Sequence, residues 1–168
     1  MSPGCDSSTA ATAAPIPIER AEGVRLYDGS GRSYIDAISS WWVNIHGHNH
    51  PALNRAVKDQ LERMGHVMFA GLTHEPAAAL AEALVRIAPK EADRRLTRVF
   101  YSDNGSTAVE TALKMAVQYW RNVGRPEKRG WIALRHAYHG DTLGAMSVSA
   151  PSVFTEAFQP LLVPVERA

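Results

Sequence analysis

One polar loop in this sequence has the residue types that bind a phosphate group. The loop spans Tyr101–Thr107 and lies between an apolar run and the longest helical pattern of the chain. The start of a helix offers unpaired backbone N–H groups and a partial positive charge, and Gly105 lets a ligand come close to them. Asn, Ser and Thr are also the usual helix-capping types. On this pattern alone, a phosphate site at Gly105 and Ser106 and a plain helix cap both stay open.

A second loop, His136–Thr142, also follows an apolar run, and its residue types indicate what kind of ligand could bind. If both runs are parallel strands, both loops lie at the sheet edge where ligands gather in α/β proteins. Tyr138 and the neighbouring imidazoles suit a flat aromatic cofactor, although a polar capping loop fits the pattern equally well. The first loop lacks the Gly-Lys-Ser/Thr ending of triphosphate-binding loops and the Gly-x-Gly-x-x-Gly of dinucleotide-binding loops, so we expect neither ligand.

Two adjacent tryptophans, Trp41 and Trp42, precede a histidine-rich stretch at 46–51. Adjacent side chains point in different directions in most conformations, so we expect one tryptophan in the core and the other on the wall of a pocket. The alternating histidines of 46–51 invite a metal-site interpretation. Gly, Asn and Pro residues interrupt that stretch, however, and no acidic or cysteine ligand occurs in it. We therefore expect loop and helix-cap roles there and no metal site.

The remaining reactive side chains are one cysteine and four lysines. Cys5 lies within residues 1–15, a small, polar and aperiodic stretch that we expect to be a disordered leader. A single cysteine excludes an intramolecular disulfide and favours a reducing compartment, so we expect a cytoplasmic protein. The lysines all fall on polar helix faces or in charged connections: Lys58, Lys90, Lys114 and Lys128.

Several local patterns predict the elements that must position these residues. Alternation around the Asp28-Gly29 turn predicts a β-hairpin with strands at 24–28 and 33–37. Amphipathic patterns predict three helices: one from Pro51 to about Met64, one that starts near 73–76 and ends before Pro89, and one from about Ser106 to Val123. On the third helix, the spacing of Glu110 and Lys114 predicts an outward ion pair.

Short apolar runs at 98–101 and 131–134 bracket the third helix, and another occurs at 161–165. Strand, helix and strand in this order are typical of a βαβ unit, which implies a parallel sheet and the α/β class. A sheet of two or three parallel strands has uncovered edges and little core. We therefore expect the chain to be the front part of a larger α/β protein.

The overall composition excludes two broad function classes. The 168 residues are 45% hydrophobic, and 18 Lys plus Arg stand against 17 Asp plus Glu, which leaves a net charge of +1. Nucleic-acid and membrane-surface proteins usually carry a basic excess, so we expect neither partner. No apolar run approaches the roughly 20 residues that span a bilayer.

Taken together, the segments resemble the class III pyridoxal-phosphate-dependent aminotransferases of fold type I. The resemblance covers about residues 15–165. It rests on four motifs: the Asp28-Gly29 hairpin before Tyr34-Ile35-Asp36, the turn Gly47-His48-Asn49-His50-Pro51, the loop Asp103-Asn104-Gly105-Ser106 followed by Glu110 and Lys114, and Tyr138-His139-Gly140. The implied fold is a three-layer α/β/α large domain, incomplete here, preceded by an N-terminal β-hairpin segment.

The resemblance implies a role for five residues and pyridoxal phosphate as cofactor. Gly105 and Ser106 match the residues that hold the cofactor phosphate through backbone N–H and hydroxyl groups. Tyr138 matches the aromatic residue beside the pyridine ring and the substrate. Trp41 matches a tryptophan that contacts the substrate, and Trp42 matches its supporting neighbour.

A narrower resemblance points to the branch of this family that acts in biotin synthesis. It rests on four further segments: Ser39-Ser40-Trp41-Trp42, His66-Val67-Met68-Phe69, Gln118-Tyr119-Trp120 and the stretch 140–147. This branch implies small-molecule substrates, with S-adenosylmethionine as amino donor and 8-amino-7-oxononanoate as acceptor, and a homodimer of the full-length protein. Another class III aminotransferase that acts on ω-amino acids or polyamines, and a non-catalytic fragment, stay open as alternatives.

The sequence also departs from the family pattern. The lysine that forms a Schiff base with the cofactor, the aspartate that pairs with the pyridine nitrogen and the arginine that binds the substrate carboxylate match no residue here and are expected downstream. The usual N-terminal Trp-His-Pro-Tyr segment is absent. We therefore expect no catalytic residue in this chain, and no activity from it alone. The expected organisation is a leader at 1–15, the hairpin and pocket segment at 16–50, and the first part of the cofactor-binding large domain at 51–168.

Overall fold

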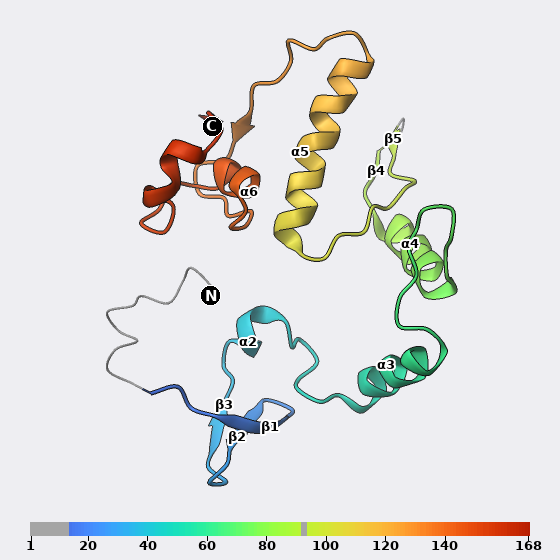
Figure 1. Cartoon of the computed structure of the whole chain (residues 1–168), viewed down its shortest axis with the longest axis vertical. Helices are drawn as coiled ribbons and strands as arrows, with labels where there is room; N and C mark the ends of the chain where they lie inside the picture. Colours follow the sequence, from blue (N-terminus) through green and yellow to red (C-terminus); the bar gives the residue numbers. More distant parts are fainter. Residues whose placement is uncertain (1–13, 92–93) are drawn as a thin grey trace. The chain divides into compact units, whose positions relative to one another are not determined.

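The computed structural model describes residues 14–91 and 94–168 (Figure 1). Nearly all of the expected leader, including Cys5, lies outside the described residues. The chain divides into two compact units, one that extends to Leu96 and one from Thr97 to Ala168. Each unit is described by itself below.

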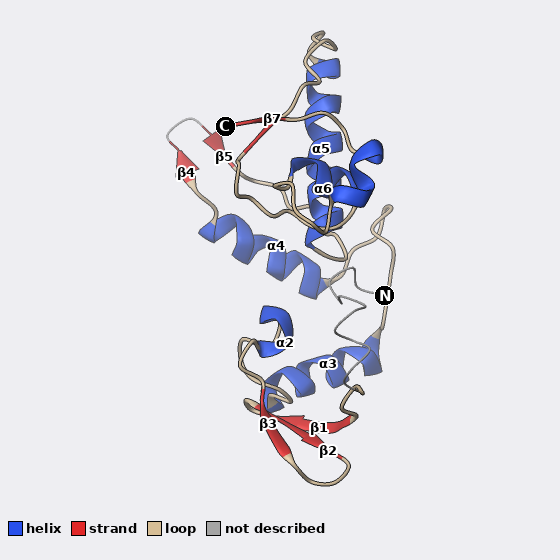
Figure 2. Cartoon of the chain, turned by 90° about the vertical axis from the view of Figure 1, so that its left-hand side faces the viewer, coloured by secondary structure: helices blue, strands red, loops and turns tan. Residues whose placement is uncertain are grey.

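The first unit begins with a three-stranded antiparallel sheet in the order β1-β2-β3 (Figure 2). Its strands are β1 (Ile18–Glu22), β2 (Arg25–Asp28) and β3 (Ser33–Ile35). The predicted hairpin between β2 and β3 is confirmed, with Leu26 opposite Tyr34. The sequence did not predict β1, because Ile-Glu-Arg-Ala-Glu lacks the period-two alternation of a half-buried strand.

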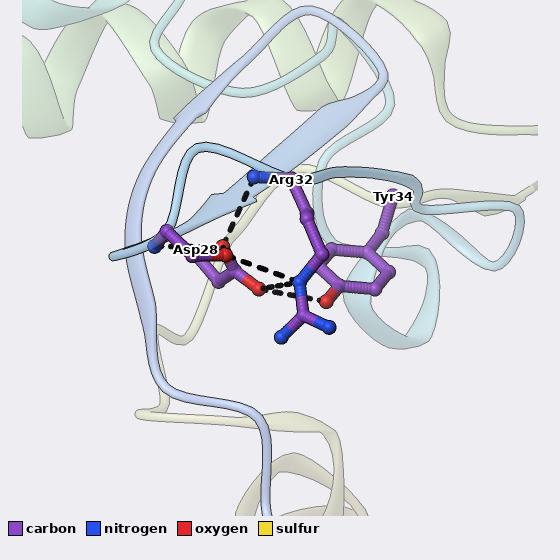
Figure 3. A network of polar contacts seen from close by, with 4 residues as sticks. Asp28, Arg32 and Tyr34 are labelled. Carbon is purple, nitrogen blue, oxygen red and sulfur yellow. Dashed lines mark hydrogen bonds and ion pairs between the residues drawn. The ribbon is translucent and has the colours of Figure 1, made fainter.

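Asp28 connects the turn of this hairpin to both of its strands (Figure 3). Its buried carboxylate accepts hydrogen bonds from the backbone N and hydroxyl of Ser30 at 2.9 and 2.7 Å. It also accepts from the backbone N and Nε of Arg32 at 3.0 and 2.9 Å, and from the Tyr34 hydroxyl at 2.8 Å. These donors, with the Ser30 hydroxyl first, hold the pKa of Asp28 well below its ordinary range.

The lowered pKa of Asp28 predicts acid-sensitive hairpin stability. Because the pKa is lower in the folded hairpin than in the unfolded chain, the contribution of the carboxylate is complete above about pH 4 and declines as the pH falls further. We expect amide exchange at Ser30 and Arg32 to accelerate below that pH. The Asp28→Asn chain should exchange fast at every pH. The matched variant Asp59→Asn alters an exposed carboxylate on another element and should leave the profile unchanged.

The rest of the first unit contains short helical segments and a small hairpin. The predicted helices at 51 and 75 are confirmed as α3 (Pro51–Arg63) and α4 (Glu75–Ile87), each with a proline in its first turn. A short segment labelled α2 (Ser39–Trp42) precedes them, and β4 (Lys90–Glu91) pairs with β5 (Arg94–Arg95) after them.

The second unit is built on the long helix α5 (Gly105–Asn122), which confirms the third helix prediction. The shorter elements are β6 (Ile132–Ala133), α6 (Leu143–Val148), the 3-10 helix η1 (Glu156–Leu161) and β7 (Glu166–Arg167). Strand β6 pairs in parallel with β7. Helix α6 contacts α5, and both helices are labelled in Figure 1.

Two strand predictions in this unit are wrong. The run at 98–101 is not a strand, and at 161–165 the chain leaves η1 and forms a strand only at 166–167. An apolar run becomes a strand only where a neighbouring backbone accepts its hydrogen bonds. Within the described parts of the chain, β7 is the partner of β6, and the run at 98–101 pairs with no strand.

The buried core of the described residues is small and lies in the second unit. Its apolar members are Ala133, Ala145, Met146 and Val148. The predicted apolar stripe of α3 is instead exposed, with Leu53, Val57 and Leu61 at 51%, 59% and 63% exposure. This apolar stripe makes α3 amphipathic, but no element in the described part of the chain covers it. Among the residues described, no helix has the length and apolar character needed to cross a bilayer.

Candidate functional site

Helix α5 begins with a capping box and with two backbone N–H groups that have no acceptor within the described chain. Asn104 accepts a hydrogen bond from the Thr107 backbone N at 3.0 Å, and the Thr107 hydroxyl accepts from the Asn104 backbone N at 3.2 Å. This reciprocal cap satisfies the third helical residue. Within the described chain, nothing accepts a hydrogen bond from the backbone N–H of Gly105 or Ser106. The cap therefore uses the Thr107 N–H and leaves the N–H groups of Gly105 and Ser106, which the sequence predicted for a phosphate, without an acceptor in the described chain.

The second loop is attached directly to this helix end. The Ser106 hydroxyl accepts a hydrogen bond from the Asp141 backbone N at 3.1 Å. Gly140 has a φ of +127°, and a Cβ placed on it would lie 3.0 Å from the Cα of Ser106. The backbone therefore approaches α5 more closely than a residue with a side chain would allow. The structure thus brings together Ser106 and the loop that carries Tyr138, two predicted site residues.

Glu110, one turn further along α5, hydrogen-bonds the C-terminal side of the loop that carries Tyr138. Its Oε1 accepts from the Thr142 hydroxyl and the Gly144 backbone N, both at 2.6 Å, and from the Ala145 backbone N at 3.1 Å. The Thr142 hydroxyl is the largest cause that lowers the pKa of Glu110. The predicted outward pair with Lys114 is therefore wrong. Glu110 turns toward the start of α6, because that start offers unpaired donors to a carboxylate.

Tyr138 presents an exposed ring on a constrained backbone. Tyr138 is 71% exposed, and its hydroxyl donates a hydrogen bond to Asp141 Oδ2 at 3.0 Å. That hydrogen bond raises the pKa of Tyr138, because it favours the protonated phenol. The next residue, His139, donates its backbone N–H to the Ser149 hydroxyl at 2.8 Å. Sequence reasoning did not single out Asp141, which contacts both Tyr138 and Ser106.

Trp41 and Trp42 lie in the first unit, on a turn with a left-handed backbone conformation. Four consecutive non-glycine residues have positive φ: Ser39 at 49°, Ser40 at 47°, Trp41 at 65° and Trp42 at 66°. Each such residue costs about 1–2 kcal/mol in the left-handed region. The two tryptophans are 63% and 76% exposed, so the expectation that one lies in the core is wrong. Both tryptophans on this left-handed turn are therefore accessible to a ligand.

The histidines of the 46–51 stretch have different contacts. His48 Nε2 lies 2.7 Å from Asp36 Oδ2, whereas the His46 and His50 rings meet edge to face with centroids 6.2 Å apart. Within residues 14–91 and 94–168, no group of three or more His, Cys, Asp or Glu side chains is arranged to hold a metal ion.

The geometry of the second unit suits a phosphate monoester that carries a flat ring. Two open N–H groups at a helix start bind a phosphate dianion without a cationic side chain. The exposed Tyr138 ring offers a face for stacking. Asp141 supplies a carboxylate next to that ring, at 3.0 Å from its hydroxyl.

Comparisons with known proteins connect this geometry to one family. The family model described as aminotransferase class-III matches residues 7–168. A relative from Synechococcus elongatus, named adenosylmethionine-8-amino-7-oxononanoate aminotransferase, is 52% identical over 152 residues, which are 90% of this chain and 35% of that protein. A relative of the same name from Aquifex aeolicus is 51% identical over 144 residues, which are 86% of this chain and 31% of that protein. The chain thus spans about a third of the length of the curated relatives it matches.

Solved structures of transaminases share the fold of this chain. The structure of adenosylmethionine-8-amino-7-oxononanoate aminotransferase from Methanocaldococcus jannaschii is 39% identical, with a TM-score of 0.89 over 98% of this chain and 37% of that one. An omega transaminase from Pseudomonas jessenii in complex with PMP is 27% identical, with a TM-score of 0.87 over 100% of this chain and 36% of that one. The chain therefore has the fold of the front part of a fold type I transaminase.

Proposed function

Because the chain belongs to the class-III aminotransferase family, we propose that it forms the front part of a pyridoxal-phosphate-dependent aminotransferase of biotin synthesis. In this proposal, the enzyme transfers the amino group of S-adenosylmethionine to 8-amino-7-oxononanoate and yields 7,8-diaminononanoate. The observation that carries it is the pair of open N–H groups at Gly105 and Ser106 beside the Tyr138 loop. Relatives that bear the corresponding name are 43–53% identical to this chain.

The residues at the start of α5 fit the cofactor in charge and shape. The N–H groups of Gly105 and Ser106 would bind the phosphate, and the Ser106 hydroxyl, which accepts from Asp141, still has a proton to donate. Tyr138 would cover one face of the pyridine ring, with its hydroxyl held by Asp141. When bound there, pyridoxal phosphate supplies the electron-withdrawing ring that carries an amino group from donor to acceptor.

The substrate side of the proposal rests on Trp41 and Trp42. Both rings are exposed on the left-handed turn, which leaves them free to contact a ligand. We assign the Schiff-base lysine to a segment downstream of these residues. The uncovered apolar stripe of α3 supports action within a longer polypeptide. Cytoplasmic localisation and a homodimer of the full-length enzyme are part of the same proposal.

The test of this function is a hybrid enzyme. In it, this chain replaces the 152 matched residues of the Synechococcus elongatus relative. We expect the hybrid to bind pyridoxal phosphate and to form the diamine product from S-adenosylmethionine and 8-amino-7-oxononanoate, measured by chromatography. The intact relative is the positive control. A folded, cofactor-loaded hybrid that aminates ω-keto acids but not 8-amino-7-oxononanoate would contradict the proposal and favour the omega-transaminase alternative.

Ser106→Ala is expected to weaken cofactor retention in the hybrid by about 1–3 kcal/mol, the usual effect of losing a hydrogen bond to a charged group. The change removes a hydroxyl donor to the phosphate and also the acceptor of the Asp141 N–H. Cofactor titration followed by absorbance measures the effect. Ser152→Ala is the matched control, because within the described chain the Ser152 hydroxyl makes no hydrogen bond. Equal affinities in the two variants would remove Ser106 from the site.

Trp41→Ala is expected to raise the substrate KM of the hybrid about tenfold or more, because a ring that covers substrate contributes binding energy without joining the chemistry. The absorbance spectrum of the bound cofactor should stay unchanged. Steady-state kinetics and spectra of the same preparation provide both readouts. Val43→Ala, at a neighbouring residue that is 76% exposed, is the control. A collapsed cofactor spectrum with an unchanged KM would mean that Trp41 is a structural residue.

A further inference from the structure

The left-handed turn at 39–42 requires an external support, and the structure contains one. Residues other than glycine avoid positive φ, so a run of four is held by contacts from outside the run. Backbone hydrogen bonds also join the turn to its flanks: Ser39 N donates to Asp36 O at 3.2 Å, Trp42 N to Ile38 O at 2.9 Å, and Val43 N and Asn44 N both to Ser39 O, the last at 3.1 Å. These bonds fix the ends of the turn. The middle of the turn, at Ser40, is held by a side chain.

That side chain is the carboxylate of Asp36. Its Oδ1 accepts from the Ser40 backbone N at 2.9 Å, and its Oδ2 accepts from the Ser40 hydroxyl at 2.8 Å. The Asp36 backbone is itself bonded to the β1–β2 connection, because its N–H donates to Val24 O at 2.9 Å. Ser40 directly precedes Trp41. The Asp36 carboxylate therefore fixes the backbone position from which the two tryptophans extend.

His48 supports the same carboxylate from the other side. Its Nε2 lies 2.7 Å from Asp36 Oδ2, and the side chains of the pair are only 14% and 6% exposed. The His48 backbone is paired with Gly23, with N–O distances of 2.7 and 3.0 Å in the two directions. Three segments that are separate in sequence therefore meet at Asp36: the β1–β2 connection, the turn and the histidine loop.

A purely structural role in the hairpin does not explain these contacts. The carboxylate of Asp28 already connects the strands and turn of the hairpin, through Ser30, Arg32 and Tyr34. None of the hydrogen bonds to the Asp36 carboxylate reaches a strand residue. Within the part of the chain that the structure describes, its hydrogen bonds go to Ser40 of the turn and to His48. The two aspartates, eight positions apart, thus serve different parts of the unit.

We propose that Asp36, supported by His48, is a positioning residue that holds the Ser39–Trp42 turn so that Trp41 and Trp42 face the substrate. This inference rests on the proposed function, because it takes the tryptophans as substrate contacts. Asp36 touches neither substrate nor cofactor in this role. It acts through Trp41, and its removal therefore affects substrate binding only while Trp41 is present.

A double-mutant cycle in the hybrid enzyme tests this coupling. Asp36→Ala should raise the substrate KM about tenfold, with kcat changed less and the cofactor spectrum unchanged. Asp36→Asn should have a smaller effect, because its amide oxygen still accepts from the Ser40 backbone. In a Trp41→Ala background, Asp36→Ala should add little further change, since residues that act through one contact are not additive.

Asp28→Asn is the matched control for general destabilisation. It removes the charge of the buried Asp28 at the end of β2 and should lower the melting temperature without changing KM. Equal KM effects from Asp28→Asn and Asp36→Ala would overturn the proposal, because they would show a structural cause. Fully additive effects of Asp36→Ala and Trp41→Ala would also overturn it.

A second measurement on the 168-residue chain separates this inference from the proposed function. Strong intraresidue amide–Hα NOEs mark residues with positive φ, and we expect them at Ser40 and Trp41. They should vanish in Asp36→Ala and persist in Asp28→Asn. Persistence in Asp36→Ala would overturn the positioning role even if the hybrid transaminates. If the parent hybrid fails to transaminate, the proposed function fails, and the NOE comparison still decides whether Asp36 holds the turn.

Discussion

Gly140→Ala is expected to weaken cofactor binding in the hybrid enzyme by about 2–5 kcal/mol, from typical costs of backbone strain and of overpacking combined. The φ of +127° at Gly140 disfavours any side chain, and an added Cβ would lie 2.8 Å from the Cβ of Ser106. To relieve that clash, the loop must move away from α5. Such a movement breaks the Ser106–Asp141 hydrogen bond and displaces Tyr138 from the ring site. Cofactor titration and the melting temperature measure the two consequences.

Two further variants separate the clash from a general loss of stability. Gly130→Ala adds a Cβ that meets nothing within 4 Å, so affinity and melting temperature should stay close to those of the parent. Ser106→Gly in the Gly140→Ala background removes the clashing side chain. It should recover part of the melting temperature but not the cofactor affinity, because the hydroxyl is lost. If Gly140→Ala and Gly130→Ala bind the cofactor equally well, the close approach is not needed for the site.

Helices and the phosphate-type loop were predictable because their signals are local. Pro51 starts α3, and Gly124 lies two residues beyond the end of α5, so the boundaries follow from residue types alone. Gly105 and Ser106 follow from the same logic, since a helix start has open N–H groups wherever it occurs. What the sequence left undecided was whether Asn104 caps or a ligand binds. The structure shows that the cap uses Thr107 and leaves two donors open.

Glu110 and the tryptophan turn were mispredicted because both depend on tertiary partners. The rule that pairs Glu110 with Lys114 uses contacts within one helix, whereas the donors at Thr142 and Gly144 come from another element. The left-handed turn contradicts the local preference of every residue in it. Asp36 and His48, which hold it, lie outside the turn, so no pattern within 39–42 predicts it.

The strands show a third kind of limit. The runs at 98–101 and 161–165 have apolar composition but no strand, whereas β1 and β7 are strands of largely polar sequence. Pairing defines a strand, and a pairing partner is a property of the fold rather than of the run. Sequence reasoning therefore recovered the α/β class, the β2–β3 hairpin, the strand at β6 and a parallel pairing, but it placed two further strands on the wrong segments.

The 168-residue chain alone is expected not to transaminate, even with excess pyridoxal phosphate. Transamination needs a lysine amine close enough to bond to the cofactor aldehyde and to move a proton at the substrate carbon. The four lysines of the chain are all exposed. Lys114 lies eight residues beyond Ser106 on α5, which is about 12 Å along the axis from the phosphate end. Lys128 is held over the Trp120 ring, 4.2 Å from its centroid.

The experiment compares the chain with the hybrid enzyme under the same conditions. Both are incubated with pyridoxal phosphate, treated with borohydride and mapped by mass spectrometry for cofactor fixed to lysine. Because the chain still has the open donors of Gly105 and Ser106, weak reversible cofactor binding is compatible with the prediction. Stoichiometric fixation on one lysine is expected only in the hybrid, on a residue that the relative contributes. Fixation on Lys58, Lys90, Lys114 or Lys128 of the isolated chain, together with turnover of an amino donor, would place the catalytic lysine within these residues and overturn the prediction.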